Sequence, residues 1–233
     1  MGSAQLWKNV ELVQRGERIT VGGNEFSGIE RLRFLNILHG RCQKLGVKLQ
    51  FEANVGGLQQ VSDCDLLVGA DGLKSIVREA HREAFGPRTQ ERRNKYIWYG
   101  TPKAFHALTM IFRPHDDGLY IAHAYKFQPE LSTFIVECDA LTWERGGFDR
   151  RSEEQTATYL AEVFGPELGG APLLSNRSVW YSFLLVRNTK WHHQNVVLLG
   201  DALHSVHFSI GSGTTLAVED AIALAGERER DFQ

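Results

Sequence analysis

The sequence of 233 residues contains only three cysteines, Cys42, Cys64 and Cys138, and no C-x-x-C pair. This usage argues against a disulfide framework or a zinc site, and it is typical of reduced thiols in a cytoplasm. The sequence also lacks an apolar run long enough to cross a membrane, and its start lacks the basic and apolar segments of a signal peptide. A net charge of −2 gives no electrostatic attraction to nucleic acid. We therefore expect a cytoplasmic protein that binds neither nucleic acid nor a membrane.

The hydropathy pattern predicts strands and helices in alternation, without repeats. A capping-box pattern at Ser27-Gly28-Ile29-Glu30 predicts the start of a helix that ends at Gly46 and carries an apolar stripe of leucines and isoleucines. A second capping box, which begins at Ser152, predicts a helix that continues to about Phe164. Predicted strands, the first two arranged as a hairpin, cover residues 10–13, 18–21, 47–51, 65–70, 96–100, 104–112, 119–127, 132–138, 179–186 and 195–199, and a last helix covers residues 213–225.

Two of the predicted strands are short, almost continuous apolar runs. They cover residues 65–70 and 195–199, and such runs are typical of strands that are buried on both faces of a parallel sheet. The strands between residues 96 and 138 instead follow one another with short turns, which indicates an antiparallel sheet. We therefore expect an α/β (mixed α+β) fold with an inserted antiparallel sheet.

Each of the two apolar strands leads into an acidic residue beside a glycine. Asp71-Gly72 follows the first strand, and Gly200-Asp201 follows the second. The second segment continues to a glycine-rich loop at residues 211–215, which opens the last helix and so has backbone N–H groups without intrahelical partners. An acid beside a row of free N–H groups suits a ligand with hydroxyls and an electron-rich edge.

Simpler structural interpretations are open for the same residues. Asp71 can cap the helix that follows it, Asp201 can be a turn residue, and the glycines can form only a tight turn. His204 and His207 suggest a metal site, but no carboxylate or cysteine supports the pair, so we expect no metal. A serine hydrolase is not expected either, because the sequence has no G-x-S-x-G elbow.

The two acidic segments resemble the D-G and G-D fingerprints of the FAD-dependent aromatic hydroxylases, the single-component flavoprotein monooxygenases. Four further stretches, residues 26–29, 98–101, 132–138 and 207–214, are similar to the branch that acts on aromatic coenzyme A thioesters, which includes anthraniloyl-CoA monooxygenase and salicylyl-CoA 5-hydroxylase. The resemblance covers nearly the whole chain. It implies an FAD/NAD(P)-binding Rossmann-like domain at residues 1–92 and 176–233, and a substrate region of antiparallel strands at residues 93–175.

The resemblance also implies roles for single residues. Asp201 would accept a hydrogen bond from a ribityl or ribose hydroxyl of FAD, and Asp71 with Gly72 would lie near the pyrophosphate. Arg31 matches a family arginine near the cofactor, and His204 and His207 are candidates near the flavin without an assigned acid or base role. The N–H groups that would point at the flavin ring belong to Gly211, Ser212, Gly213, Thr214 and Thr215.

The reaction that the resemblance implies is hydroxylation of an aromatic substrate by molecular oxygen. NAD(P)H would reduce FAD, and a flavin hydroperoxide would then hydroxylate the ring of an aromatic acyl-CoA thioester. Arg113 or Lys126 could meet the phosphates of coenzyme A. A homo-oligomer and a fused or separate flavin domain are further partners to consider.

The chain departs from the family pattern at one place. Family members begin with a strand, a G-x-G-x-x-G loop and a helix, and no segment of this sequence matches that unit. We therefore expect an incomplete FAD-binding domain and, from this chain alone, weak flavin binding. Two alternatives stay open: a non-catalytic remnant that acts as an interaction segment, and a flavoenzyme of the same fold with other chemistry, such as an epoxidase or a halogenase.

Overall fold

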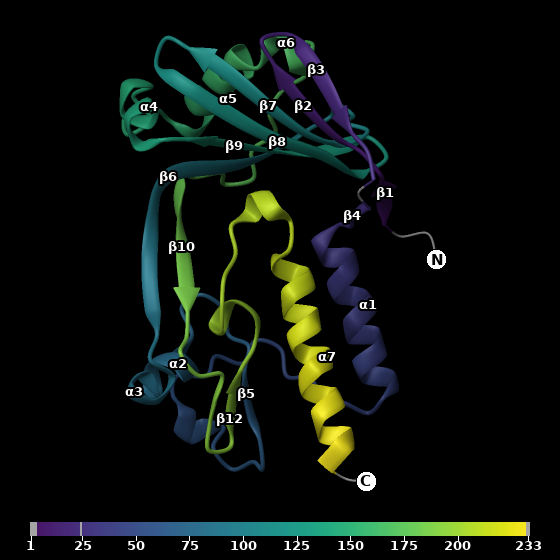
Figure 1. The fold of residues 1–233 in the computed structure, drawn as a ribbon, viewed down its shortest axis with the longest axis vertical. Helices are drawn as coiled ribbons and strands as arrows, with labels where there is room; N and C mark the ends of the chain where they lie inside the picture. The colour runs from purple at the N-terminus through teal and green to yellow at the C-terminus, as the bar shows by residue number, and fades with distance from the viewer. Residues whose placement is uncertain (1–3, 24, 232–233) are drawn as a thin grey trace. The chain divides into compact units, whose positions relative to one another are not determined.

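A computed structural model describes residues 4–23 and 25–231 and divides into two compact units (Figure 1). Unit 1 comprises Met1–Gln50 and Arg93–Ser182, and unit 2 comprises Phe51–Arg92 and Phe183–Gln233. Strands β6 (Arg88–Thr101) and β10 (Tyr181–Arg187) each cross from one unit into the other.

Unit 1 is built on a mixed sheet. The order of the whole seven-stranded sheet is β10-β6-β9-β8-β7-β2-β3. The pairs β6–β9, β9–β8, β8–β7 and β2–β3 are antiparallel, whereas β2 and β7 pair in parallel. The other elements of unit 1 are β1 (Gln5–Trp7), β2 (Val10–Gln14), β3 (Glu17–Val21), β4 (Phe26–Gly28), α1 (Arg31–Lys44), β7 (Leu108–His115), β8 (Gly118–Gln128), β9 (Leu131–Cys138), α4 (Ala140–Arg145), α5 (Glu153–Val163) and α6 (Gly165–Leu168).

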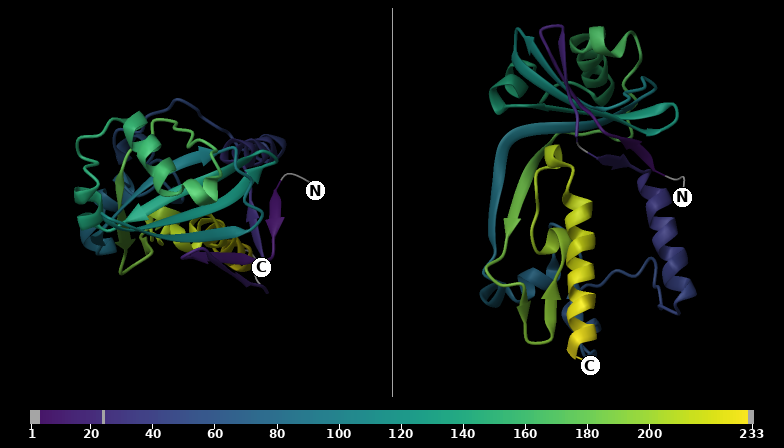
Figure 2. Two further views of the ribbon diagram at one scale, coloured as in Figure 1. Left: turned by 90° about the horizontal axis from the view of Figure 1, so that it is seen from above. Right: turned by 45° about the vertical axis from the view of Figure 1, so that its right-hand side comes forward.

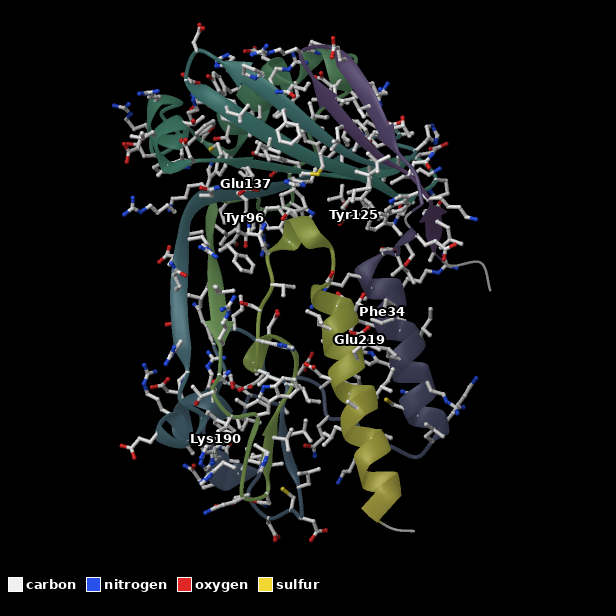
Figure 3. The ribbon with its side chains drawn as sticks, in the orientation of Figure 1. Phe34, Tyr96, Tyr125, Glu137, Lys190 and Glu219 are labelled. Atoms are coloured by element: carbon white, nitrogen blue, oxygen red, sulfur yellow. The ribbon has the colours of Figure 1, made fainter. Side chains whose placement is uncertain are left out.

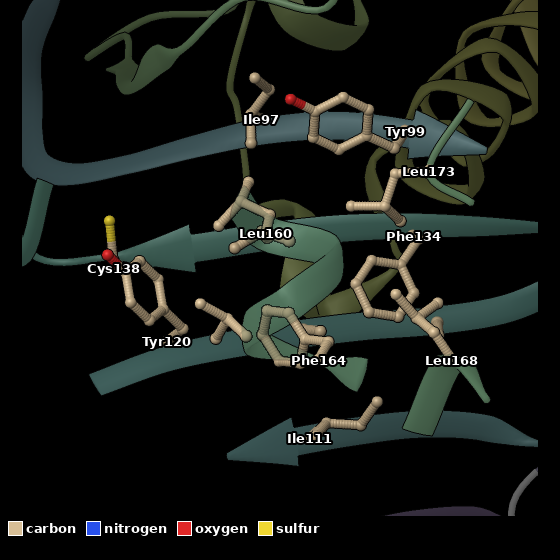
Figure 4. Packing of buried hydrophobic residues seen from close by; sticks show 14 of the residues in the cluster. Ile97, Tyr99, Ile111, Tyr120, Phe134, Cys138, Leu160, Phe164, Leu168 and Leu173 are labelled. Carbon is tan, nitrogen blue, oxygen red and sulfur yellow. The ribbon is translucent and has the colours of Figure 1, made fainter. Parts of the chain in front are cut away.

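The core of unit 1 lies between one face of this sheet and helix α5 (Figure 4). Tyr120, Ala122 and Ala124 are all fully buried and alternate along β8, as side chains on one face of a strand must. They share a buried cluster with Leu160 and Phe164, which come from α5 and the residue that follows it. Burial of these apolar side chains fixes the register of the sheet, because a shift of one residue would turn them to the opposite face.

Unit 2 contains a small three-stranded sheet of order β11-β12-β5, in which β12 and β5 are parallel. Figure 2 shows its longest helix, α7, in yellow. The elements of unit 2 are η1 (Leu58–Gln60), β5 (Leu67–Gly69), α2 (Ile76–Ala80), α3 (Arg82–Phe85), β11 (His192–His193), β12 (Val196–Leu198), η2 (Gly200–Ala202), η3 (Phe208–Ile210) and α7 (Gly213–Asp231), where η denotes a 3-10 helix.

Several sequence-based predictions are confirmed. The hairpin is present as β2 and β3, and the four strands predicted between residues 96 and 138 are β6 to β9, with β7 beginning at Leu108. The capping box at Ser152 is complete: its Oγ accepts from the Gln155 N–H at 3.1 Å, and Gln155 Oε1 accepts from the Ser152 N–H at 2.9 Å. The last helix is longer than predicted and ends at Asp231.

Other predictions are wrong. Ser27 lies in β4, and α1 begins at Arg31 without a side-chain cap, because a Ser-x-x-Glu pattern also fits an extended segment before a helix. The predicted apolar stripe of α1 is not buried, as Leu32 is 63% exposed. Residues 47–51 form no strand. Val68 of β5 is 38% exposed, so this strand is not buried on both faces.

The predicted domain boundaries differ from the compact units in two respects, because residues 1–50 and residues 176–182 both belong to unit 1. Residues 1–50 cluster with the large sheet, because β2 extends that sheet by pairing with β7. The strands predicted between residues 96 and 138 pair antiparallel as expected, and the added β2 makes the whole sheet mixed. The assignment of functional domains to residues 1–92 with 176–233 and to residues 93–175 stays a prediction.

Candidate functional site

Parallel pairing of β5 and β12 brings both acidic turns to one edge of the small sheet. Leu198 is opposite Gly69, and the Leu199 N–H donates to the Gly69 carbonyl at 2.9 Å. Since both strands end here, Asp71 and Asp201 leave the same carboxyl edge. Ligands of open α/β sheets bind outside this edge. An added Cβ on Gly69 would lie 2.9 Å from side-chain atoms of Val77 and Leu198, so only glycine permits this packing.

The turn after β12 is held by helix α7. Gly200 has a φ of +56°, and an added Cβ would lie 3.1 Å from the Cβ of Ala217 on α7. The buried carboxylate of Asp220, also on α7, accepts from the Gly200 N–H at 2.9 Å and lies 2.9 Å from His204 Nε2. These contacts fix Asp201 relative to the start of the helix.

Asp201 has a carboxylate without a hydrogen-bond donor among the described residues. Surrounding protein partly desolvates it and raises the pKa of its carboxyl above the ordinary value, while the neighbouring His204 opposes this rise. Asp201 is an exposed residue, so its carboxylate is accessible and can accept hydrogen bonds from ligand hydroxyls. A ligand-binding role of Asp201 stays a prediction.

The loop at residues 211–215 opens helix α7 as predicted. The helical hydrogen bonds of α7 begin with the Leu216 N–H, which donates to the Ser212 carbonyl at 2.9 Å. The N–H groups of Gly213, Thr214 and Thr215 come before this bond and have no partner within the helix. Gly211 has a φ of +69°, and an added Cβ there or at Gly213 would meet nothing within 4 Å. The loop therefore offers N–H groups, the positive end of a helix dipole and open space beside the backbone.

Asp71 has the simpler role that was open from the sequence. Its carboxylate accepts from the N–H groups of Ile76 at 2.7 Å and Val77 at 3.3 Å, so it caps α2 together with Ser75. Gly72 has a φ of +81° and forms the turn between strand and helix. A direct role of Asp71 and Gly72 at a pyrophosphate stays a prediction.

Arg78 joins the two acidic segments, and sequence reasoning gave it no role. Its buried guanidinium donates to the carbonyl of Ala202 at 2.8 Å and to the carbonyl of Leu73. Burial lowers the pKa of Arg78, and the negative charge of Asp71 opposes this effect. The sequence gave no signal for this role, because a buried arginine and a solvated one look alike on a short helix.

His204 and His207 take part in structural contacts. His204 is held by Asp220, and its ring centroid lies 5.7 Å from that of Trp191. His207 Nδ1 lies 2.8 Å from Ser209 Oγ. The structure gives neither histidine an acid or base role. Among the described residues, no group of three or more histidine, cysteine or acidic side chains could hold a metal.

The remaining candidates belong to unit 1 and stay predictions. Arg31 is the exposed first residue of α1. Arg113 forms an ion pair with Glu167, so its charge already has a partner within unit 1. Lys126 lies on β8.

The fold and the paired turns define a flavoprotein class. The family model of the FAD binding domain matches residues 43–227, and the chain belongs to this family. The predicted family, cofactor class and Rossmann-like α/β fold are therefore confirmed. In the described residues, no helix is long and apolar enough to span a bilayer.

Two curated relatives and one solved structure illustrate the similarity. Salicyloyl-CoA 5-hydroxylase of a Streptomyces species is 39% identical over 235 residues, which cover 96% of this chain and 46% of that protein. Protodeoxyviolaceinate monooxygenase of Chromobacterium violaceum is 40% identical over 219 residues, which cover 92% and 58%. The crystal structure of Pseudomonas aeruginosa PqsL in complex with 2-aminobenzoylacetate has a TM-score of 0.73 at 18% identity and covers 96% of this chain and 68% of that one. The chain thus spans about half the length of the curated relatives it matches.

The raised pKa of Asp201 predicts a gain in stability when its charge is removed. The folded state holds the Asp201 proton more tightly than the unfolded state. Ionisation of Asp201 therefore destabilises the fold as the pH rises from below the ordinary pKa of aspartate to above the raised pKa. Asp201→Asn should therefore unfold at a higher temperature than the original chain near neutral pH. The difference should disappear near pH 3, below the ordinary pKa of aspartate.

Thermal unfolding monitored by circular dichroism over a series of pH values measures this effect. Glu219→Gln is the matched control, because Glu219 is an exposed acid on α7 (Figure 3). A stability difference for Asp201→Asn that does not change with pH would contradict the argument.

Proposed function

We propose that this chain is the flavin-binding part of an FAD-dependent monooxygenase that hydroxylates an aromatic substrate. The observation that carries the proposal is the Asp201 carboxylate, which lacks a described donor and lies beyond the carboxyl edge of β12. The loop that opens α7 supports it, because the N–H groups of Gly213, Thr214 and Thr215 precede the helical hydrogen bonds. The space beside Gly211 and Gly213 is also open. An acid and a set of N–H donors match the hydroxyls and the electron-rich ring edge of a flavin.

The residues of this chain bind and orient the cofactor in this proposal. Asp201 accepts from a hydroxyl of the ribityl chain or ribose, and Gly213 to Thr215 donate toward the ring edge that becomes negative on reduction. The helix dipole of α7 favours such a negative charge by about 0.3–1 kcal/mol. Bound FAD supplies the redox and oxygen chemistry, and the protein supplies binding and electrostatics. NAD(P)H is the proposed reductant and molecular oxygen the second substrate.

An aromatic acyl-CoA thioester is the proposed substrate. Its support is the name of the Streptomyces relative and the predicted similarity of residues 207–214 to the CoA-thioester branch. The Chromobacterium relative is named for protodeoxyviolaceinate, so free acids need to be compared directly. The proposed location is the cytoplasm, where the three cysteines stay reduced, and a homo-oligomer or an additional flavin domain is the expected assembly.

Flavin affinity is expected to depend on Asp201. In a titration of the purified chain with FAD, followed by flavin fluorescence, Asp201→Ala should raise the Kd at least about tenfold, because it removes a charge-assisted hydrogen bond. Glu219→Ala, which changes an exposed acid on α7, should leave the Kd unchanged. Binding is expected to be weak in absolute terms, and equal affinities of the two variants would remove Asp201 from the site.

Substrate-stimulated oxidation of NAD(P)H tests the activity. Salicyloyl-CoA or anthraniloyl-CoA should stimulate oxidation in the presence of FAD, whereas the free acids should not, and a hydroxylated product should accumulate. Stimulation by the free acids alone would contradict the thioester assignment. Absence of both flavin binding and stimulation would favour the non-catalytic interaction segment without bound flavin. Incorporation of halide or formation of an epoxide would favour other flavin chemistry.

A further inference from the structure

A cavity of about 470 Å³ lies entirely within unit 2. It is lined by one side of strand β10, by residues 203–207, by Trp191 and by Arg92 of β6. Its volume is within the range of small-molecule sites, which is about 300–1,000 Å³. Asp201 and the loop at residues 211–215 are not among its lining residues, so it is distinct from the proposed flavin edge.

The lining of this cavity has cationic groups and no acidic ones. Arg92 and Arg187 contribute permanent positive charges, and His204 and His207 contribute imidazoles. Among the described residues, neither arginine forms an ion pair with a carboxylate. His204 lies 2.9 Å from the carboxylate of Asp220 and also neighbours Asp201, so the acidic partners are on the histidine side of the cavity. Two unpaired guanidinium groups in one cavity suit a phosphate ligand, because arginine binds phosphate oxygens in a bidentate manner.

The walls of the cavity are fixed to each other by Ser205. Its Oγ donates to the Leu184 carbonyl at 2.8 Å and accepts from the Val186 N–H at 2.8 Å. The Ser205 N–H in turn donates to the Val186 carbonyl at 3.0 Å. Three hydrogen bonds of Ser205 therefore hold β10 against residues 203–207. Arg187 of β10 and the two histidines consequently line a preformed space, which a ligand does not have to create.

Aromatic side chains accompany the positive charges. Trp191 is 54% exposed although its ring contacts His204, and the ring centroids of Phe183 and His207 lie 5.0 Å apart. An exposed indole beside arginines can stack on a heteroaromatic base while the arginines bind its phosphates. Stacking of a base on an aromatic side chain contributes substantially to binding and tolerates different bases.

We propose that this cavity binds the adenosine phosphate portion of a nucleotide. The proposal rests on the proposed function for the source of the ligand, because an acyl-CoA substrate and NAD(P)H both carry adenosine with phosphate groups. Arg92 and Arg187 bind the phosphates, Trp191 stacks on the base, and His204 and His207 complete the polar wall.

Isothermal titration calorimetry on the full chain without FAD tests this proposal. The ligands are CoA, NADPH and NADH, with inorganic pyrophosphate as the ligand that lacks adenosine. Arg187→Gln and Arg92→Gln should each weaken binding of at least one nucleotide by about tenfold or more. Arg88→Gln, an exposed arginine on β6 outside the cavity lining, is the matched control and should have no effect.

Two further variants allow the proposal to be tested even if Arg187→Gln or Arg92→Gln fails to fold. Arg187→Lys should recover part of the nucleotide affinity that Arg187→Gln loses, because it keeps the positive charge. Trp191→Leu should weaken the binding of nucleotides but not the binding of pyrophosphate. Binding of CoA alone identifies the substrate as the source, and binding of NADPH or NADH alone identifies the reductant. The proposal is overturned if no nucleotide binds, if pyrophosphate binds as tightly as the nucleotides, or if Arg88→Gln weakens binding as much as Arg187→Gln.

Failure of this proposal is distinguishable from failure of the proposed function. FAD also carries adenosine diphosphate and is therefore titrated against the same variants. FAD binding that is lost in Arg187→Gln and retained in Asp201→Ala would support the cavity and contradict the flavin edge. Loss in Asp201→Ala with retention in Arg187→Gln, together with no binding of CoA, NADPH or NADH, would support the flavin edge and overturn the cavity.

Discussion

The carboxylate of Asp220 joins helix α7 to the turn that follows β12, and the geometry of the candidate site depends on it. It accepts from the Gly200 N–H and lies 2.9 Å from His204 Nε2. Loss of this buried acceptor would leave a backbone N–H without a partner, at a cost of about 1–3 kcal/mol. The start of α7, Asp201 and the segment that leads to His207 are consequently held as one arrangement.

The Asp201 carboxylate and the N–H groups at the start of α7 lack protein partners among the described residues, which is unfavourable for the stability of the chain without a ligand. A partly desolvated carboxylate without donors and N–H groups ahead of a helix are costs of folding that a suitable ligand removes. Asp201, in the turn after β12, has a raised pKa, and Gly211, in the loop that opens α7, has open space beside its backbone. Residues 201–207 also contribute to both proposed sites, since Asp201 belongs to the flavin edge and His204 to the cavity with two arginines.

Sequence patterns were sufficient where local chemistry determines the structure. The apolar run of β12, the glycine-rich loop before α7 and the capping box at Ser152 could all be predicted, because each depends on neighbouring residues. Arg78 and Asp220 could not, because their partners lie on other elements: Arg78 binds the Ala202 carbonyl, and Asp220 binds the Gly200 N–H. The apolar stripe of α1 was misjudged for a related reason, since helical periodicity gives a face but not what covers it.

Hydrogen–deuterium exchange of this chain with and without FAD tests the central claim most directly. If Asp201 and the start of α7 form the flavin edge, saturating FAD should slow exchange of the backbone amides of Gly213, Thr214 and Thr215, because these N–H groups precede the helical hydrogen bonds and would become donors to the ligand. Unchanged exchange at these amides, with protection confined to residues 203–207 and β10, would show that FAD binds elsewhere in unit 2 and would contradict the account.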